Sequence, residues 1–275
     1  MMKKKILIIG VNSFIGNNLY IFLKKKFDIR IIHYKDFIQL NVKTLIDVTY
    51  IINCASNKRY VKKKYSKKND FDIKIAEKII DSKCKLIFFS TRKIYQIDDN
   101  IRENSKLNPK CNYSINKLIT EKKLNKILNK KVLILRISNL IGLNNSSNLK
   151  NKIHNTFIDH FFLNINKNKI FNNFKNYKDF ISIDKFNEII FKLIKKNVVG
   201  IYNVSLGQKV YLNELISNLN FHNQNKCKIV NIPEKFNNDC FYLNNKKLLK
   251  TIDVKISLSD LKRYCRLLSN IYFKN

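Results

Sequence analysis

The chain is poor in proline, in acidic residues and in long apolar runs. Its two prolines, Pro109 and Pro233, provide no obvious linker between domains. Lys or Asn interrupts every apolar run before it reaches the ~20 residues that a membrane-spanning helix needs. The N-terminus has the basic start of a signal peptide, but its apolar run is too short and no small-residue cleavage site follows. We therefore expect a cytoplasmic enzyme that does not span a membrane.

Cysteine and histidine are present, but neither is arranged as a ligand set. No two of the six cysteines have the paired spacing of a zinc site or a disulfide framework. The four histidines stand apart from carboxylates at ligand spacing. We expect reduced thiols and no metal site. These residues are Cys54, Cys84, Cys111, Cys227, Cys240, Cys265, His33, His154, His160 and His222.

The shortage of acidic residues gives the chain a formal net charge of +34. A charge of this size could serve non-specific binding to nucleic acid. However, most of the cations are lysines spread along the chain among many Asn and Ile residues, and arginine is rare. The densest basic run, 62–68, has the composition of an exposed loop or helix start. We expect a solvated lysine-rich surface and no nucleic-acid partner.

Short apolar runs alternate with helical patterns through the first two thirds of the chain. The 275 residues are 45% hydrophobic, which is enough for a sizeable core. Continuous apolar strands separated by helices indicate a parallel sheet covered on both faces. The sequence predicts strands over 5–9, 29–33, 37–40, 50–54, 85–89 and 132–136, and helices over 14–25, 72–82 and 112–128.

The pattern becomes polar and rich in Asn after Gly142. We expect a loop over 144–151 and a helix over 153–163. A strand over 180–183, a helix over 185–196 and a strand over 200–204 predict a return to the sheet. The remainder, 211–275, would complete a smaller cap.

Tyr113 stands four residues before Lys117 within the predicted helix 112–128. Residues four apart share a helical face, so the phenol and the ammonium group would point into the same space. A nearby cation stabilises phenolate and lowers a tyrosine pKa that starts near ~10. Such a tyrosine can exchange a proton with a sugar or alcohol oxygen at neutral pH.

The segment 10–16 joins the first predicted strand to the first predicted helix. A nucleotide pyrophosphate would bind at this helix N-terminus, where free amides and the helix dipole attract anions. Gly10 would allow the tight turn, and Gly16 would let the helix pack close to the strand. Ser13 occupies the position of the middle glycine in the usual dinucleotide-binding pattern.

Six further segments accompany this loop in a fixed order: 51–56, 89–95, 109–121, 135–142, 177–184 and 200–204. Together with the loop, they resemble the extended short-chain dehydrogenase/reductase family, and in particular its nucleotide-sugar epimerases, dehydratases and reductases. The resemblance covers nearly the whole chain. It implies a Rossmann-type doubly wound parallel sheet with a small C-terminal α/β substrate-binding cap. The NAD(P)-binding domain would span 1–143, with 177–204 returning to it, and the cap region 144–275.

The resemblance also implies roles for individual residues. Tyr113 would transfer the proton, Thr91 would hydrogen-bond the same substrate oxygen, and Lys117 would hold the nicotinamide ribose and lower the pKa of the phenol. Asn139, Lys178 and Lys235 would bind the nucleotide-sugar substrate, with Lys178 standing where the family commonly has Arg. The implied cofactor-binding residues are Gly10, Asn12, Ser13, Phe14, Ile15, Gly16, Tyr34, Lys35, Asn53, Cys54, Ala55, Tyr113 and Lys117.

The end of the second predicted strand bears on the choice of cofactor. An acidic residue about 20 residues beyond the glycine loop would bind the adenosine ribose of NAD. The chain has His33, Tyr34 and Lys35 there, which favours the 2′-phosphate of NADP(H) over NAD(H), although Asp36 follows directly.

The residues after Thr91 bear on the type of reaction. Dehydratases of the family usually have an acidic pair there, and this chain has Arg92 and Lys93. The resemblance therefore favours NADPH-dependent reduction of a nucleotide-linked 4-keto-(deoxy)sugar for surface polysaccharide, similar to dTDP-4-dehydrorhamnose reductases and the CDP-paratose and abequose synthases. An NAD-dependent nucleotide-sugar 4-epimerase and a non-catalytic protein that binds RNA or another polyanion remain alternatives. A homodimer is also left open.

Overall fold

The structure, a computed structural model, describes residues 4–142, 161, 169–172, 174–224, 228–231 and 239–273. The predicted loop over 144–151 lies outside these residues. So do the predicted helix over 153–163, apart from residue 161, and Lys235.

Six parallel strands form the central sheet, in the order β10-β5-β4-β3-β1-β2. This confirms the predicted Rossmann-type fold. The last strand in the sequence, β10, pairs with β5, so the chain returns to the sheet after leaving it. The strands are β1 (Lys5–Ile9), β2 (Asp28–Ile32), β3 (Val48–Asn53), β4 (Lys85–Thr91), β5 (Val132–Ile137) and β10 (Gly200–Val204).

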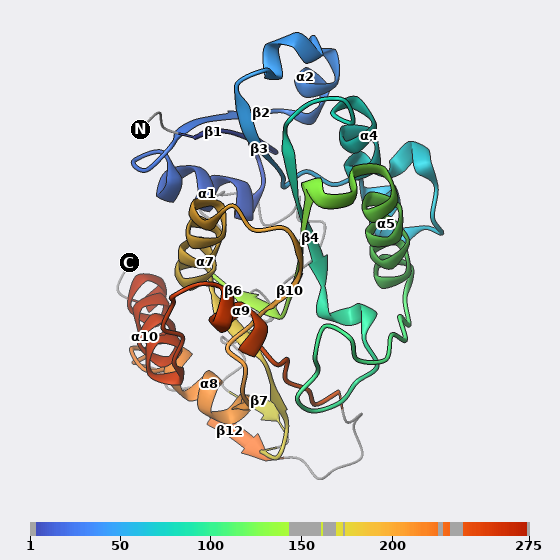
Figure 1. Ribbon diagram of the computed structural model, residues 1–275. Helices are drawn as coiled ribbons and strands as arrows, with labels where there is room; N and C mark the ends of the chain where they lie inside the picture. The colour runs from blue at the N-terminus through green and yellow to red at the C-terminus, as the bar shows by residue number, and fades with distance from the viewer. Residues whose placement is uncertain are drawn as a thin grey trace.

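Helices cover both faces of this sheet because its strands are apolar on both sides. In β1, Ile6 and Ile8 belong to the core on one face, whereas Leu7 and Ile9 belong to the core on the other. Helices α1 and α7 cover the first face, and α4 and α5 cover the second (Figure 1). The helices of the sheet region are α1 (Phe14–Leu23), α2 (Tyr34–Gln39), α3 (Lys58–Lys62), α4 (Phe71–Lys78), α5 (Asn112–Leu128) and α7 (Ile183–Lys196).

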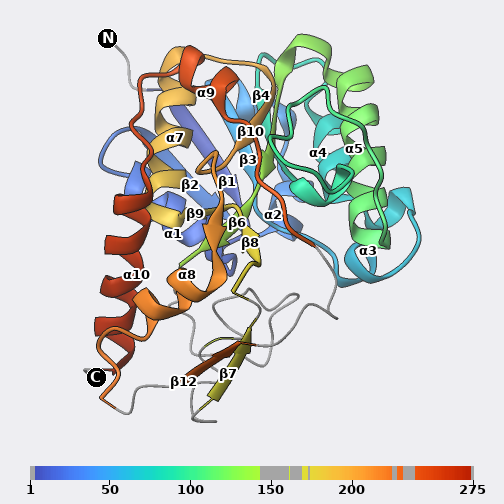
Figure 2. The ribbon, with the colours of Figure 1, turned by 90° about the horizontal axis from the view of Figure 1, so that it is seen from below.

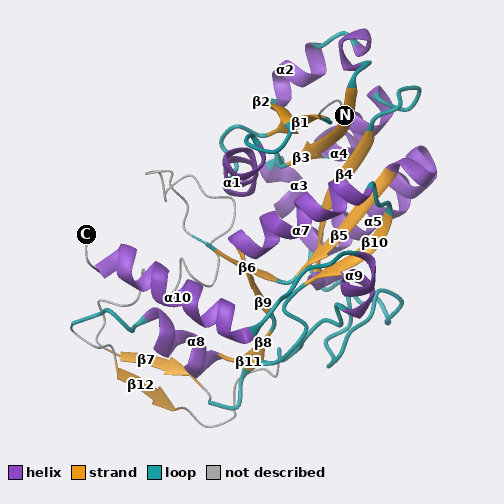
Figure 3. Ribbon diagram, turned by 60° about the vertical axis from the view of Figure 1, so that its left-hand side comes forward, coloured by secondary structure: helices purple, strands orange, loops and turns teal. Residues whose placement is uncertain are grey.

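Most of the remaining elements gather at one end of the molecule, away from α2 and β2, whereas α9 (Lys246–Thr251) lies against β10 of the central sheet (Figure 3). Three two-stranded sheets, β11-β8, β12-β7 and β6-β9, lie outside the central sheet. The pair β7 and β12 lies farthest from it (Figure 2). These elements are β6 (Asn139–Ile141), β7 (Lys169–Asn172), β8 (Tyr177–Lys178), β9 (Phe180–Ser182), β11 (Val210–Tyr211), α8 (Leu212–Leu219), β12 (Lys228–Asn231), α9 (Lys246–Thr251) and α10 (Leu258–Phe273).

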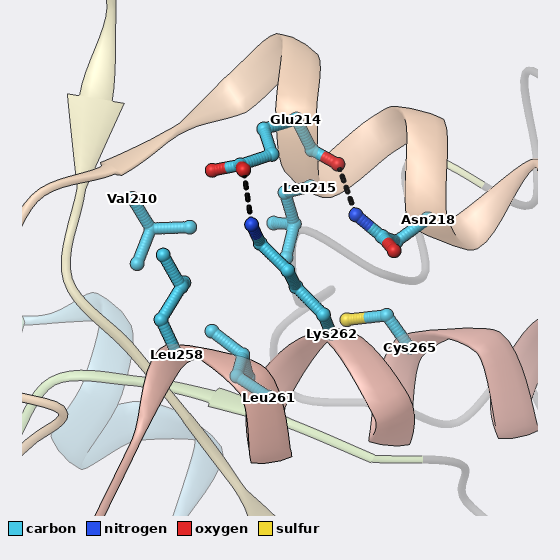
Figure 4. A pocket seen from close by; sticks show the side chains of 8 residues that line it. All are labelled: Val210, Glu214, Leu215, Asn218, Leu258, Leu261, Lys262 and Cys265. Carbon is cyan, nitrogen blue, oxygen red and sulfur yellow. Dashed lines mark hydrogen bonds and ion pairs between the residues drawn. The ribbon is translucent and has the colours of Figure 1, made fainter.

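Helices α8 and α10 pack along an apolar seam (Figure 4). Leu215 and Leu261 are buried in it, and an ion pair between Lys262 and Glu214 closes its rim. The space between the two helices is thus part of the core of this region.

Two sequence predictions about strands were wrong. Residues 37–40 lie in and just after α2 and form no strand, because only Phe37 is buried there while Ile38 is 38% exposed. A strand in the sheet would bury both faces of this run. The predicted strand over 180–183 corresponds to β9, but β9 pairs with β6 in a separate sheet beyond the end of β5.

Candidate active site

The loop between β1 and α1 lies against the end of β3. Gly10 has a φ of +122°, and a Cβ there would lie 2.9 Å from the amide nitrogen of Ala55 and from the carbonyl carbon of Cys54. A Cβ at Gly16 would lie 2.7 Å from the carbonyl oxygen of Gly10. Because neither glycine has a Cβ, the loop, the helix and the strand can approach closely, as a dinucleotide-binding turn requires.

Ser13 is the N-cap residue of α1. Its Oγ accepts a hydrogen bond from the backbone N–H of Gly16 at 3.3 Å. The serine therefore serves as a helix cap at the position of the missing glycine, and α1 keeps an N-terminus whose dipole favours anions. Asn12 is exposed on this loop, whereas Phe14 and Ile15 are partly buried against the core. The loop fits a nicotinamide dinucleotide.

The end of β3 places Asn53, Cys54 and Ala55 beside this loop. The backbone N–H of Cys54 donates to the carbonyl of Ile9 at 2.8 Å. The Asn53 side chain accepts from the backbone N–H of Ala55 at 3.0 Å and donates to Asp72 at 2.7 Å. Burial and the charge of Asp72 raise the pKa of the Cys54 thiol, so this cysteine stays protonated.

Tyr113 and Lys117 lie one turn apart on α5, as the sequence predicted. The Lys117 side chain reaches into the protein, where its Nζ lies 4.4 Å from the centroid of the Phe88 ring. Thr91 ends β4, and its Oγ1 accepts from the backbone N–H of Lys93 at 3.3 Å. Because α5 packs against the turn that follows Thr91, these residues lie at the same edge of the sheet. A phenol, an ammonium group and a hydroxyl at this edge can together move a proton.

A buried polar network holds α5 against the starts of α3 and α4. The Tyr60 hydroxyl and Thr120 Oγ1 lie 2.7 Å apart, and Thr120 donates to Asp70 at 2.6 Å. The Asn116 side chain donates to the carbonyl of Tyr60 at 2.7 Å. These contacts lie on either side of Lys117 along α5 and hold this part of the helix against α3 and α4.

Asp72 in the first turn of α4 is a site residue that the sequence reasoning missed. It is 6% exposed, and burial raises its pKa to about 7, although the Lys117 charge and the Asn53 hydrogen bond act in the opposite direction. The sequence signal was weak, since an aspartate near a helix start is common for reasons of capping alone. The inward direction of this carboxyl becomes visible only in the structure, from the orientation of α4 about its own axis.

The predicted adenosine-ribose residues follow β2. Tyr34 and Lys35 begin α2, and the Tyr34 ring stacks on Phe71 with the ring centroids 3.5 Å apart. Burial, with the charges of Asp72 and Asp70, raises the pKa of the Tyr34 phenol to about 12. Lys35 and the neighbouring Asp36 are both exposed in the same turn. This turn offers a lysine and a carboxylate side by side.

The predicted substrate lysine lies in a charge cluster between the sheet and the cap. Lys178 Nζ is 2.9 Å from Asp239 Oδ2, and Arg92 donates both Nη groups to the same carboxylate at 3.2 Å. The Arg92 guanidinium carbon also lies 3.8 Å from the centroid of the Phe241 ring. The two cations hold the pKa of Asp239 below its usual range, although burial acts against them. Arg92 was not predicted as a binding residue, but its position directly after Thr91 could have suggested one.

Asn139 in β6 is hydrogen-bonded to Asp179, which lies between β8 and β9. The Asn139 side chain donates to the carbonyl of Asp179 at 3.0 Å, so its amide is used in an internal contact. The carboxylate of Asp179 accepts the backbone N–H groups of Leu206 at 2.9 Å, Gly207 at 3.2 Å and Leu243 at 3.0 Å. Burial raises the pKa of Asp179 to about 7.

The described residues contain no group of three or more His, Cys, Asp or Glu side chains that could hold a metal ion. Within the same ranges, no helix is long and apolar enough to cross a membrane.

Comparison with known proteins gives both a family and a fold. A family model described as the NAD dependent epimerase/dehydratase family matches residues 6–205. No curated protein matches the chain.

Solved structures of this fold are similar over nearly the whole chain. The UDP-N-acetylglucosamine 4-epimerase from Methanobrevibacter ruminantium M1 has a TM-score of 0.80 at 17% identity, covering 99% of each chain. The dTDP-4-dehydrorhamnose reductase from Bacillus anthracis, in complex with NADP, has a TM-score of 0.74 at 19% identity, covering 97% of this chain and 99% of that one. The dTDP-glucose 4,6-dehydratase of the same organism, in complex with NAD, has a TM-score of 0.74 at 17% identity, covering 99% and 97%. At these identities the likeness shows the fold.

Proposed function

The chain belongs to the NAD dependent epimerase/dehydratase family, and we propose that it uses NADPH to reduce the keto group of a nucleotide-linked 4-keto-(deoxy)sugar. The observation that carries the proposal is the meeting of four features at one edge of the sheet. The glycine loop, the end of β3, Thr91 and the α5 pair Tyr113 and Lys117 all follow or face the carboxyl ends of parallel strands. This is the edge at which open α/β sheets bind their ligands.

The bound cofactor would supply the hydride for this reduction. The loop 10–16 would hold its pyrophosphate, and the end of β3 would lie along the cofactor. Lys117 would hold the nicotinamide ribose. Tyr113 would donate its proton to the substrate oxygen as negative charge develops there. The Thr91 hydroxyl would donate a hydrogen bond to the same oxygen, while Lys117 would stabilise the phenolate left on Tyr113.

The segment after Thr91 favours reduction over dehydration. Arg92 is bound to Asp239 and stacked on Phe241, and the backbone N–H of Lys93 binds Thr91. Neither side chain offers the carboxylic acid that the family's dehydratases usually have at these two positions.

The charge cluster between sheet and cap suits the substrate diphosphate. Lys178 is 26% exposed, and we propose that it binds this group together with Arg92. The phosphates would then replace Asp239 in part of its contacts with the two cations, because phosphate and carboxylate both present anionic oxygens. Asn139 and Lys235 remain substrate-binding predictions, as Lys35 remains one for the 2′-phosphate of NADPH.

A panel of UDP-, dTDP-, GDP- and CDP-linked 4-keto sugars tests the proposal through the loss of NADPH absorbance. We expect turnover with at least one substrate and a preference for NADPH over NADH. NAD that copurifies with the protein, with turnover of a 4-hydroxy nucleotide sugar in the absence of added reductant, would instead indicate a 4-epimerase. Failure to bind either dinucleotide, with salt-sensitive binding to RNA, would indicate the polyanion-binding alternative.

A further inference from the structure

Arg136 is a buried cation of β5 that has no part in the chemistry proposed above. It is 4% exposed, and all three nitrogens of its guanidinium group donate hydrogen bonds within the protein. Nε and Nη2 donate to the carboxylate of Glu121 on α5, at 3.2 and 2.7 Å. Nη1 donates to the hydroxyl of Tyr95 and to the backbone carbonyl of Glu103, each at 2.8 Å. One side chain thus joins β5, α5 and the segment between β4 and α5.

This segment, residues 95–108, connects the two groups that are assigned to the substrate oxygen. It follows the turn after Thr91 and leads into the helix that carries Tyr113. All of its residues are described, and they form no helix or strand. Its two ends are joined where the backbone N–H of Asn108 donates to the carbonyl of Ile94 at 2.9 Å. The path between these ends therefore depends on contacts from other elements.

A second buried side chain holds the same segment beside Arg136. Asn203 of β10 pairs with Arg136 across the sheet and accepts the Tyr95 hydroxyl at 2.8 Å. Burial raises the pKa of Tyr95 to about 12, so the phenol keeps the proton that it donates. The Asn203 side chain donates to the carbonyl of Ile101, and its backbone N–H donates to the Glu103 carboxylate, each at 2.9 Å. Two adjacent strands thus fix the middle of the segment.

The position of Arg136 in the sheet relates these contacts to the candidate site. Arg136 pairs with Ser90 of β4, the residue directly before Thr91. Glu121 lies two turns after Tyr113 on the same helix. The hydrogen bonds of the guanidinium group therefore run from the strand position beside Thr91 to the helix that carries Tyr113.

We propose that Arg136 is a positioning residue that holds Tyr113 in place relative to Thr91. It acts through Glu121 on α5 and through Tyr95 in the segment 95–108. This inference rests on the proposed function, which assigns Tyr113 and Thr91 to the same substrate oxygen. A buried ion pair adds little net stability, because taking both charges out of water costs about as much as their attraction returns. The contribution of this pair is therefore to geometry, and stability and activity can be separated.

The first experiment separates them with Arg136→Met and with the double variant Arg136→Met/Glu121→Leu. The single variant should melt well below the wild type, because it leaves the buried Glu121 carboxylate without its partner. The double variant should melt close to the wild type. Its kcat should nevertheless be ~10²-fold lower at a near-normal KM, since a displacement of about 1 Å can have this effect. A wild-type kcat in a stable double variant would show that the pair is only structural and would overturn the proposal.

Tyr95→Phe tests the same contacts with a smaller change, and Tyr50→Phe is its matched control. Both tyrosines are buried, and each donates to the side-chain oxygen of an asparagine at 2.8 Å. Tyr50, however, bonds to Asn197 at the end of α7, and its strand position pairs with the first residue of β4. We expect Tyr95→Phe to lower kcat by ~10-fold, a part of the loss in the double variant, and Tyr50→Phe to keep the wild-type value. Equal kcat values in the two variants would contradict the proposal.

Hydrogen–deuterium exchange provides a test that needs neither cofactor nor substrate. We expect the backbone amides of residues 95–108 and of the first turn of α5 to exchange faster in the double variant and in Tyr95→Phe than in the wild type. Tyr50→Phe should leave them unchanged. Unchanged exchange there in the double variant would refute the role of Arg136. Faster exchange, in a protein whose wild type reduces no sugar of the panel, would keep the structural contacts but reject the proposed function.

Discussion

Asp72 and Asp179 are buried aspartates in two different regions of the molecule, and burial raises the pKa of each to about 7. Asp179 lies at the junction of sheet and cap, where three backbone N–H groups bind its oxygens. Asp72 lies at the carboxyl edge of the sheet, where it binds one side-chain amide and faces the charge of Lys117.

The difference shows that a raised pKa alone does not identify a functional residue. Backbone partners are fixed in place, so Asp179 ties three segments of chain together and is a structural residue. The hydrogen-bond partner of Asp72 is the Asn53 side chain, in a segment that we expect to line the cofactor. Changes near Asp72 should therefore alter chemistry, and changes near Asp179 should alter stability.

The largest effect is expected at the carboxyl edge of the sheet. Tyr113→Phe should lower kcat by about 10²- to 10⁴-fold, because the variant cannot donate the proton, while cofactor affinity stays near wild type. Tyr50→Phe is the matched control, since Tyr50 is a buried tyrosine whose hydroxyl donates to Asn197 instead. It should keep the wild-type kcat. Normal turnover in Tyr113→Phe, measured with the substrate found in the panel, would show that Tyr113 is not the proton donor.

At the junction, Asp179→Ala should lower the free energy of unfolding by ~3 kcal/mol, because it leaves buried N–H groups of Leu206, Gly207 and Leu243 without an acceptor. The kcat per folded molecule should change little. Urea unfolding measures this loss, with Asp253→Ala as the control, because Asp253 is exposed. If Asp179→Ala lowered kcat at full stability, the residue would belong to the site.

The pH dependence of stability sharpens the comparison further. An aspartate in an unfolded chain has a pKa near ~3.9, so the folded state holds the protons of Asp72 and Asp179 more tightly. Their contribution to stability is full below about pH 4 and is lost as the pH rises to about 7.

Asparagine is neutral at every pH, so the melting temperatures of Asp72→Asn and Asp179→Asn, relative to wild type, should rise between pH 5 and pH 8. Only the effect of Asp72→Asn should change when Lys117 is also replaced by Met. Calorimetric scans at a series of pH values measure both. A relative melting temperature that falls with pH would contradict the assigned pKa directions.

The smallest effect is expected in the charge cluster. Asp239→Asn removes the anion that neutralises Lys178 and Arg92. The KM for the nucleotide sugar should then fall, by about threefold, because partly exposed charges act weakly across water. Lys246→Gln, which removes a charge outside the cluster, is the control. A KM that rises in Asp239→Asn would show that the carboxylate is needed to position the two cations.

Much of the sheet could be predicted because its strands are short, continuous apolar runs. The runs that became β1, β3, β4 and β5 are buried on both faces, as a central strand of a parallel sheet requires. The prediction failed for 37–40, a run of similar composition that belongs largely to helix α2. Of the six residues of α2, only Phe37 is buried, and Ile38 is exposed. A run of four residues does not separate the two cases.

The candidate site was predictable where its residues follow strands, since the carboxyl ends of parallel strands share one edge. The roles predicted for these residues stay predictions. Asp72 and Asp239 could not be found in this way. Asp72 meets Asn53 across 19 positions of sequence and Asp239 meets Arg92 across 147, and both contacts depend on how separate elements pack.

The most direct test of the account follows the hydride. NADPH labelled with deuterium at C4 of the nicotinamide is mixed with the protein and the nucleotide-linked 4-keto sugar that reacts in the panel, and the product is examined by mass spectrometry and NMR. We expect deuterium to reach C4 of the sugar at the same rate with the wild type and with Tyr50→Phe, and at least ~10²-fold more slowly with Tyr113→Phe. Absence of transfer to every sugar of the panel, or transfer at the wild-type rate in Tyr113→Phe, would contradict the account.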